Sequence, residues 1–176
     1  MAKKFLFCPY CATPLVEAFR FDQIRPCCPS CGFVQFPDPK VAVIALVIHQ
    51  DRILLVQRGV DPAKGRWALP GGYMDAGEMP ASALQREISE EVGLAIDVRD
   101  LLKIYPMNNG EGRRVGIVLA FAASPTGDTN IDQVGDDVTA AGWFAADALP
   151  NDLAFESTTT LIEAWLAEKQ YTPDNN

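Results

Sequence analysis

The chain has 176 residues and a formal net charge of −8, with 48% of its residues hydrophobic and 22% charged. This composition is typical of a globular protein with room for one ordinary domain and a small second one. Residues 1–40 carry five Lys or Arg against three Asp or Glu, whereas residues 41–176 carry ten against twenty. Nucleic-acid binding requires a basic stripe, so the acidic second part argues against bulk binding of nucleic acid.

No stretch of the sequence predicts a membrane segment. The longest apolar run, residues 41–48, is too short to cross a bilayer, and the N-terminus lacks the apolar core of a secretory signal. We therefore expect a cytoplasmic protein with reduced cysteines and no membrane partner.

Two matched CxxC pairs dominate the first 40 residues. Cys8 and Cys11 form one pair, Cys28 and Cys31 form the other, and 16 residues separate them. Four thiolates at this spacing predict a closed tetrahedral Zn²⁺ site. Such a site can supply about 10–16 kcal/mol of folding free energy to a segment too small for a sufficient core. A redox role for either pair alone is the alternative, and Cys27 is a second candidate for the place of Cys28, which keeps the two-residue spacing.

We place the boundary between two domains after residue 39, with residues 1–39 as the zinc-binding part and residues 40–176 as the larger domain. Residues 33–39 form the connection, because their prolines disfavour helix. The β-branched run at residues 41–48 predicts a strand buried on both faces. Residues 52–57 predict a second strand, and residues 61–66 a loop.

The next elements alternate between helix and strand. Pro80 suits the first turn of a helix and Gly93 suits its C-terminal cap. Residues 115–123 and 143–144 predict strands. Ser157 is the expected N-cap of a final helix, and residues 171–176 are expected to fray.

Residues 72–94 contain an unusual concentration of carboxylates. On the expected helix Glu87, Glu90 and Glu91 stand at i, i+3 and i+4, so they share one face. Each pair of like charges at this spacing destabilises a helix by roughly a few tenths of a kcal/mol. A helix with a purely structural role would avoid such pairs. Carboxylate oxygens suit Mg²⁺ or Mn²⁺, and Mg²⁺ is commonly held by carboxylates together with substrate phosphates. The pattern predicts metal-assisted chemistry on a phosphate compound.

This stretch resembles the Nudix box, G-x5-E-x7-R-E-U-x-E-E-x-G-U with U aliphatic. Every defined position is filled, by Gly72, Glu78, Arg86, Glu87, Ile88, Glu90, Glu91, Gly93 and Leu94. The resemblance implies an α+β Nudix fold, a mixed β-sheet between helices in an α/β/α sandwich, here preceded by a small zinc ribbon. It also implies a Nudix pyrophosphohydrolase that cleaves a nucleoside diphosphate linked to another moiety.

The resemblance implies roles for the box residues. Glu87, Glu90 and Glu91 are the expected ligands of Mg²⁺ or Mn²⁺, and Arg86 orients them. Glu78 either ligates a metal or braces its loop. Gly71 or Gly72 can offer a backbone carbonyl to the cation, because the missing side chain permits a close approach.

Several residues outside the box are candidates for the general base and for phosphate contacts. Asp137 matches an acidic position in relatives with a zinc ribbon, and Asp136 and Glu111 are its alternatives. The arginines at element ends can reach a phosphate, since their forked guanidinium suits that role; they are Arg58, Arg113 and Arg114. We expect core packing for Trp67 and Trp143, and an exposed His49 in a tight turn.

The resemblance narrows the substrate only in part. A zinc ribbon ahead of a Nudix domain is similar to the NADH pyrophosphatase group, but residues 95–110 lack that group's Ser-Gln-Pro-Trp-Pro-Phe-Pro stretch. ADP-ribose, FAD or an NAD(H)-like compound is therefore the expected substrate, and a homodimer is possible. The alternative is a non-catalytic, nucleotide-binding regulatory Nudix domain whose ribbon contacts nucleic acid or protein. Such binders commonly lose box glutamates, and this box is complete.

Overall fold

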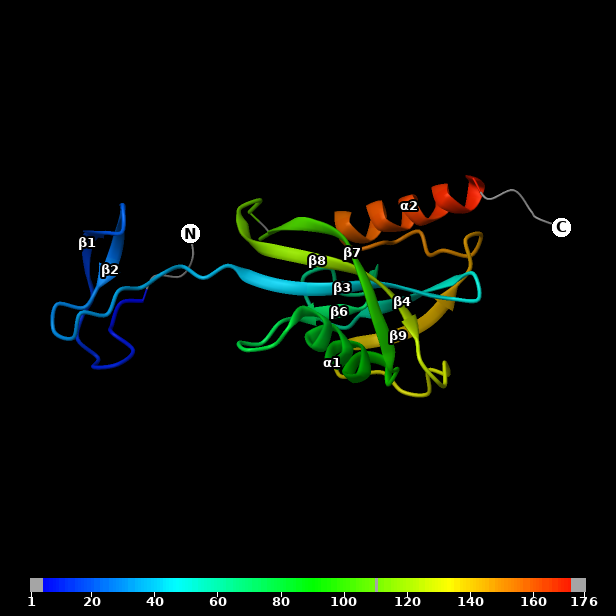
Figure 1. Ribbon diagram of the computed structural model, residues 1–176, viewed down its shortest axis with the longest axis horizontal. Coiled ribbons are helices and arrows are strands. Elements are labelled where there is room, and N and C mark those ends of the chain that lie inside the picture. Colours follow the sequence, from blue (N-terminus) through cyan, green and yellow to red (C-terminus); the bar gives the residue numbers. More distant parts are fainter. Residues whose placement is uncertain (1–4, 110, 172–176) are drawn as a thin grey trace.

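The computed structural model describes residues 5–109 and 111–171 (Figure 1). A small N-terminal unit carries the two-stranded antiparallel sheet of β1 (Val16–Arg20) and β2 (Gln23–Cys27). An extended segment joins it to the main body, from which it stands apart in Figure 1. Of the residues for which fraying was expected, 172–176 lie outside the described part.

A seven-stranded mixed sheet forms the main body, with the strand order β5-β4-β3-β8-β7 and with β6 on β3 and β9 on β4. Only the β3–β8 pair is parallel among its pairings. Its members are β3 (Lys40–His49), β4 (Arg52–Arg58), β5 (Trp67–Ala68), β6 (Gly71–Tyr73), β7 (Ile96–Asn108), β8 (Arg114–Pro125) and β9 (Val138–Phe144).

Two helices, α1 (Pro80–Val92) and α2 (Glu156–Tyr171), cover opposite faces of this sheet (Figure 1). Alternation along β3 explains the arrangement: Val43, Ala45 and Val47 pack with α1 residues, whereas Leu46 packs with α2 residues and Ile44 joins that second cluster. Both faces of β3 are therefore covered, which explains its continuous apolar run. The predicted α+β sandwich with a mixed sheet between helices is confirmed.

The final helix begins two residues earlier than its sequence predicts. Ser157 was expected at the N-cap, but it lies within the first turn. Phe155 stands at the N-cap instead, and its backbone carbonyl accepts the N–H of Thr159 at 3.3 Å, the first hydrogen bond of the helix. Among the described residues, neither helix is long and apolar enough to cross a membrane.

Candidate active site

Helix α1 holds the carboxylate cluster in place through its buried stripe. Pro80 occupies the first helical position, and Gly93 caps the other end with φ 71° and an N–H donated to Ser89 O at 3.0 Å, as predicted. Leu84, Ile88 and Val92 are at most 1% exposed and face the sheet. Because this apolar stripe packs against the sheet, the rotation of α1 about its axis is fixed, and so is the side on which the glutamates lie.

Arg86 is the central cation of the cluster. Its Nε and one terminal nitrogen donate to the two carboxylate oxygens of Glu78, at 2.7 and 3.0 Å. The other terminal nitrogen donates to Glu87 at 2.9 Å and to Glu90 at 3.1 Å. The guanidinium also donates to the backbone carbonyl of Tyr73 at 3.1 Å, which ties α1 to β6. This geometry supports the predicted orienting role of Arg86.

Both carboxylate oxygens of Glu78 are hydrogen-bonded to Arg86. It accepts both guanidinium bonds and also the backbone N–H of Asp75 at 2.8 Å. These hydrogen bonds, first that of Arg86, lower the pKa of Glu78 to about 2. Of the two roles expected for Glu78, the geometry supports bracing of the loop before α1.

Glu91 is the buried member of the cluster, with 6% of its surface exposed. One carboxylate oxygen accepts the backbone N–H of Gly71 at 2.9 Å. The pKa of Glu91 is raised to about 8, first by burial and then by the charges of Asp137 and Glu87, which together outweigh the Gly71 hydrogen bond and the charge of Arg58. A buried carboxylate among other carboxylates is poorly compensated by the protein alone.

Glu87 packs directly against the backbone of β6. A Cβ at Gly72 would overlap the Glu87 carboxylate, so only glycine permits this approach. Burial raises the pKa of Glu87; Arg86 opposes the rise, and the charges of Glu90 and Asp137 add to it.

These residues fit a hard divalent cation. The Glu87 carboxylate lies against the Gly72 backbone, and the charge of Glu87 acts on Glu91. In the described part of the chain, the four cysteines are the only group of three or more His, Cys, Asp or Glu ligand atoms within 4.8 Å of one another, so the glutamate oxygens would have to draw together around an ion. The pKa of both carboxyls is raised, which favours the protonated form relative to a free glutamate. A bound Mg²⁺ or Mn²⁺ would reverse that preference, because an ion is the largest local charge in such a site.

Asp137 lies beside the cluster, at the start of β9. Its backbone carbonyl accepts the N–H of Gly59 at 2.6 Å, and Gly135 donates to the backbone carbonyl of Glu91 at 2.9 Å. The side chain of Asp137 is exposed, and its charge acts on both Glu87 and Glu91. The neighbouring Asp136 is also exposed.

The other predicted residues divide into two groups. The charge of Arg58, at the end of β4, acts on Glu91, so this arginine lies near the cluster. Glu111 and Arg113 form a pair at 3.4 Å on the β7–β8 loop, and Arg114 starts β8. In the described part of the chain no hydrogen bond or ion pair joins these three loop residues to the box.

The tryptophans pack as predicted, and the histidine does not lie as predicted. Trp67 packs on the α2 side of the sheet and Trp143 on the α1 side. His49 was expected exposed in a turn, but it ends β3 and is half-buried. Its ring packs 5.6 Å from the ring of Trp143, which covers it.

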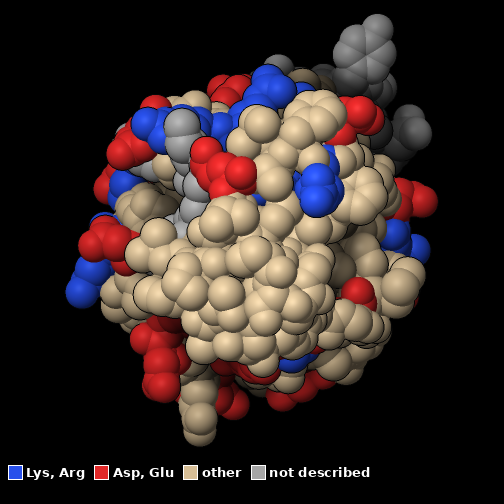
Figure 2. Space-filling model, turned by 90° about the vertical axis from the view of Figure 1, so that its left-hand side faces the viewer, with Lys and Arg blue, Asp and Glu red and all other residues tan. Residues whose placement is uncertain are grey.

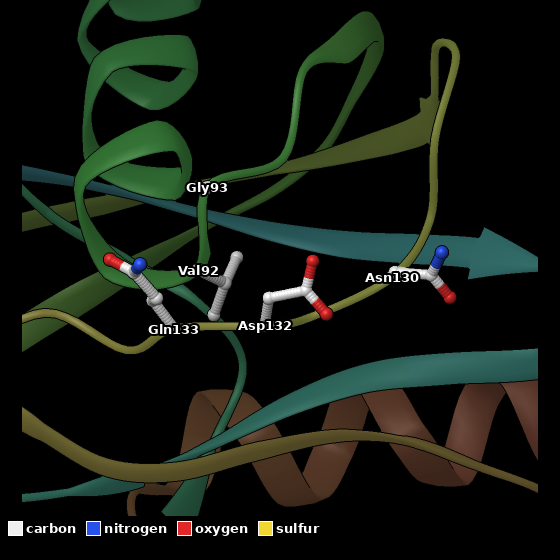
Figure 3. A pocket seen from close by; sticks show the side chains of 5 residues that line it. All are labelled: Val92, Gly93, Asn130, Asp132 and Gln133. Carbon is white, nitrogen blue, oxygen red and sulfur yellow. The ribbon is translucent and has the colours of Figure 1, made fainter.

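A shallow hollow of about 220 Å³ lies at the C-terminal end of α1 (Figure 3). Val92 and Gly93 form one wall, and Asn130, Asp132 and Gln133 form the other. None of the predicted box ligands lines it, so the hollow is not the carboxylate site.

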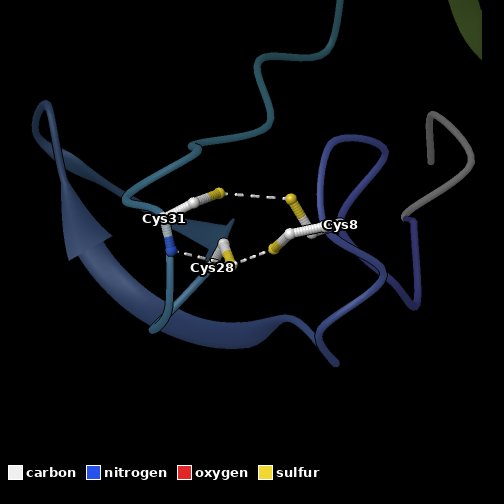
Figure 4. Close-up of side chains that lie close together, drawn as sticks. Cys8, Cys28 and Cys31 are labelled. Carbon is white, nitrogen blue, oxygen red and sulfur yellow. Dashed lines mark hydrogen bonds between the residues drawn. The ribbon is translucent and has the colours of Figure 1, made fainter.

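The four predicted zinc ligands converge in the N-terminal unit (Figure 4). Their sulfur atoms all lie within 4.8 Å of one another, and the Cys8–Cys31 and Cys11–Cys28 pairs are 3.5 Å apart. A zinc tetrahedron with bonds of about 2.3 Å needs sulfurs roughly 3.8 Å apart, so the cluster fits the ion. Cys27 points elsewhere, with its sulfur 3.4 Å from the carbonyl of Arg25.

The two knuckles share one backbone design. Ala12 N donates to Cys8 O at 2.9 Å, and Gly32 N donates to Cys28 O at 3.1 Å. Ala12 and Gly32 each follow the second cysteine of a pair and have positive φ, 57° and 79°. This repeated turn aims both thiols of a pair at one point, as a closed structural site requires.

The distal face of the N-terminal unit exposes apolar side chains. Figure 2 views the molecule from this end and shows a broad area without charged side chains, with Lys and Arg mostly toward its upper edge among Asp and Glu. Exposed apolar residues of the unit include Tyr10, Phe19, Phe21 and Ile24. The view offers no continuous basic stripe of the kind that bulk nucleic-acid binding needs.

The sequence did not predict two glycines, Gly59 and Gly135, that allow the backbones around the site to approach one another closely. A Cβ at Gly59 would lie 2.9 Å from Asp137 O, and one at Gly135 would lie 2.6 Å from Glu90 O. Both glycines flank charged candidates in the sequence, which is the only signal that could have suggested them.

Comparisons with known proteins point to one family. The NUDIX domain profile matches residues 38–165. A NAD-capped RNA hydrolase of Chromobacterium violaceum is 37% identical over 144 residues, which are 82% of this chain and 51% of that protein. An ADP-ribose pyrophosphatase of Methanocaldococcus jannaschii is 37% identical over 118 residues, 67% of this chain and 68% of that protein.

The chain thus spans about half the length of the first of these relatives. Among solved structures, the crystal structure of a NUDIX hydrolase from Nitrosomonas europaea matches 96% of this chain and 95% of its own, with a TM-score of 0.82 and 24% identity. That likeness supports the fold over nearly the whole chain.

Proposed function

The chain belongs to the Nudix family, and from this premise we propose that it is a Mg²⁺- or Mn²⁺-dependent pyrophosphohydrolase of nucleoside diphosphates linked to a second moiety. The observation that carries the proposal is the complete box with its geometry: three glutamates on one face of α1, ordered by one arginine that also grips Glu78. A non-catalytic regulatory domain has no use for this costly cluster, so we disfavour that alternative.

In the proposed reaction, water adds to one phosphorus of the diphosphate. The bond to the bridging oxygen breaks, and that oxygen leaves on the other phosphate, which gives two phosphorylated products. Glu87, Glu90 and Glu91 would hold the divalent cation, and the carbonyl of Gly72 would be a further donor. The cation, when bound, neutralises phosphate charge and lowers the pKa of a bound water.

The residues around the cluster have distinct proposed tasks. Arg86 keeps the glutamates in place while Glu78 fixes Arg86. A carboxylate oxygen of Asp137 accepts the proton of the attacking water, a role supported by its position beside Glu87 and Glu91. Arg58, near Glu91, contacts a substrate phosphate. We propose Arg113 and Arg114 as further phosphate contacts from the β7–β8 loop and the start of β8.

The substrate class follows from what the relatives share. One is named an ADP-ribose pyrophosphatase and another a NAD-capped RNA hydrolase. Both names describe a nucleotide joined through a diphosphate, so we propose an adenine dinucleotide or ADP-sugar, such as ADP-ribose, FAD or NAD(H). We further propose that residues 1–39 form a structural zinc ribbon and residues 40–176 the catalytic domain.

A product assay tests the function directly. Purified protein is incubated with a panel of such diphosphates, with and without Mg²⁺ or Mn²⁺, and phosphatase releases phosphate from the products. We expect metal-dependent phosphate release from the wild type and a loss of two or more orders of magnitude in Glu91→Gln. The exposed Glu163 of α2 supplies the control Glu163→Gln, which should keep full activity. No release from any panel member, or full activity in Glu91→Gln, would reject the proposal.

A further inference from the structure

Phe155 has a backbone conformation that its residue type disfavours. It has φ 62°, although a bulky side chain at positive φ is a genuine outlier. Phe21 also has positive φ, but it lies in the two-residue β1–β2 hairpin turn, which needs that geometry. Phe155 instead stands directly ahead of α2, where glycine would be cheaper. Unfavourable backbone conformations of this kind concentrate at functional sites.

The position of Phe155 is fixed by its neighbours. Ala154 is fully buried and donates its N–H to Trp67 O at 2.6 Å, and Leu153 forms a parallel bridge with Trp67. The Phe155 carbonyl accepts the Thr159 N–H. The side chain itself is 43% exposed. A rigid backbone thus presents an aromatic ring to solvent.

Arg58 links this ring to the catalytic cluster. Its guanidinium carbon lies 5.0 Å from the Phe155 ring centroid, and its Nε donates to Pro62 O at 2.8 Å. Among residues 5–109 and 111–171, its terminal nitrogens have no hydrogen-bond partner. Arg58 pairs with Val138 across β4 and β9, next to Asp137, and its charge is felt at Glu91.

We propose that Phe155 and Arg58 form the nucleobase end of the substrate site. The aromatic base stacks on the Phe155 ring, and Arg58 donates its free terminal N–H groups to the adjacent phosphate. Each base has a π-face, so stacking on an aromatic side chain suits a nucleotide, and guanidinium suits its phosphate. The ligand class is a nucleoside phosphate with its base attached. This inference rests on the proposed function.

The competing explanation is that Phe155 merely covers apolar surface beside α2. In that case any apolar side chain would serve, and binding would not depend on whether the ligand carries a base. If the ring stacks a base, only an aromatic side chain serves at position 155, and binding depends on the base of the ligand.

Two ligands that differ only by the base separate these explanations. AMP and ribose 5-phosphate are titrated calorimetrically into the full-length protein in the presence of Mg²⁺. Phe155→Gly removes the ring and suits the positive φ, Phe155→Tyr keeps the ring, and Phe155→Leu keeps only the apolar bulk. Phe21→Gly is the matched control, because Phe21 is also exposed and of positive φ but lies in the N-terminal unit.

We expect Phe155→Gly and Phe155→Leu to weaken AMP binding by about five- to 150-fold, the range of one lost base stack. Ribose 5-phosphate should bind unchanged in both, and Phe155→Tyr and Phe21→Gly should bind AMP normally. Unchanged AMP affinity in Phe155→Gly, or an equal loss for both ligands, would overturn the subsite. Because binding is measured without turnover, an inactive protein that shows the AMP-specific loss rejects the proposed function and keeps the subsite. An active diphosphatase without the AMP-specific loss rejects the subsite and keeps the proposed function.

Discussion

Replacing Glu91 by Gln should stabilise the metal-free protein even as it abolishes turnover. Burial raises the pKa of Glu91 from 4.5 to about 8. A folded-state pKa above the unfolded value means that the folded state holds the proton more tightly, so the contribution of Glu91 to stability is full below pH 4.5 and is lost as the pH rises through 8. At about 1.4 kcal/mol per pH unit, the loss is about 3 kcal/mol at pH 7 and about 5 kcal/mol above pH 8.

Gln avoids this loss because it does not ionise, and its carbonyl oxygen can still accept the Gly71 N–H. Urea unfolding of protein free of Mg²⁺ and Mn²⁺, followed by tryptophan fluorescence, measures the effect. The advantage of Glu91→Gln over the wild type should grow by about 2 kcal/mol between pH 6 and pH 8. The control Glu163→Gln changes an exposed side chain and should differ from the wild type by less than about 0.5 kcal/mol. A variant no more stable than the wild type at pH 8 would refute the reasoning.

Three further predictions follow from the site and the ribbon. Protein purified without added metal should contain about one zinc per chain by elemental analysis, and Cys11→Ser should lose it while Cys27→Ser keeps it; equal loss in both variants would contradict the ligand set. Gly72→Ala should displace the Glu87 carboxylate and lower kcat at least tenfold, by order of magnitude, whereas Gly142→Ala, with ring atoms no closer than 3.4 Å, should leave kcat normal. Asp137→Asn should lower kcat by roughly 10²- to 10⁴-fold while Asp136→Asn does not, and a normal Asp137→Asn rate would move the base to Glu87 or Glu90.

The sequence predicted the parts of the fold that local patterns determine. Pro80 and Gly93 marked the ends of α1, and the apolar run of β3 marked a strand covered on both faces. The β7 strand was not predicted. Its pairing with β8 shifts register twice between Val98 and Lys103, so apolar and polar residues do not alternate regularly there.

The candidate site was predictable as a set of residues but not as a set of contacts. Box spacing brings the glutamates to one helix face, yet it does not say that Glu78 is gripped by Arg86 or that Glu91 is buried. Those facts depend on where β6 lies against α1, which is a tertiary outcome. The role of Phe155 was equally invisible, because a positive φ before a helix has no signature when the residue is not glycine.

The same contacts explain why the cluster is tolerated. Arg86 binds Glu78, Glu87 and Glu90 and so offsets most of the like-charge repulsion on the exposed side of α1. It makes no hydrogen bond to Glu91, which is left buried with one backbone donor. The protein therefore keeps its strongest electrostatic cost at the position where a cation would relieve it. Stability and metal affinity are opposed at this one carboxylate, since any substitution that removes its charge removes both the cost and the ligand.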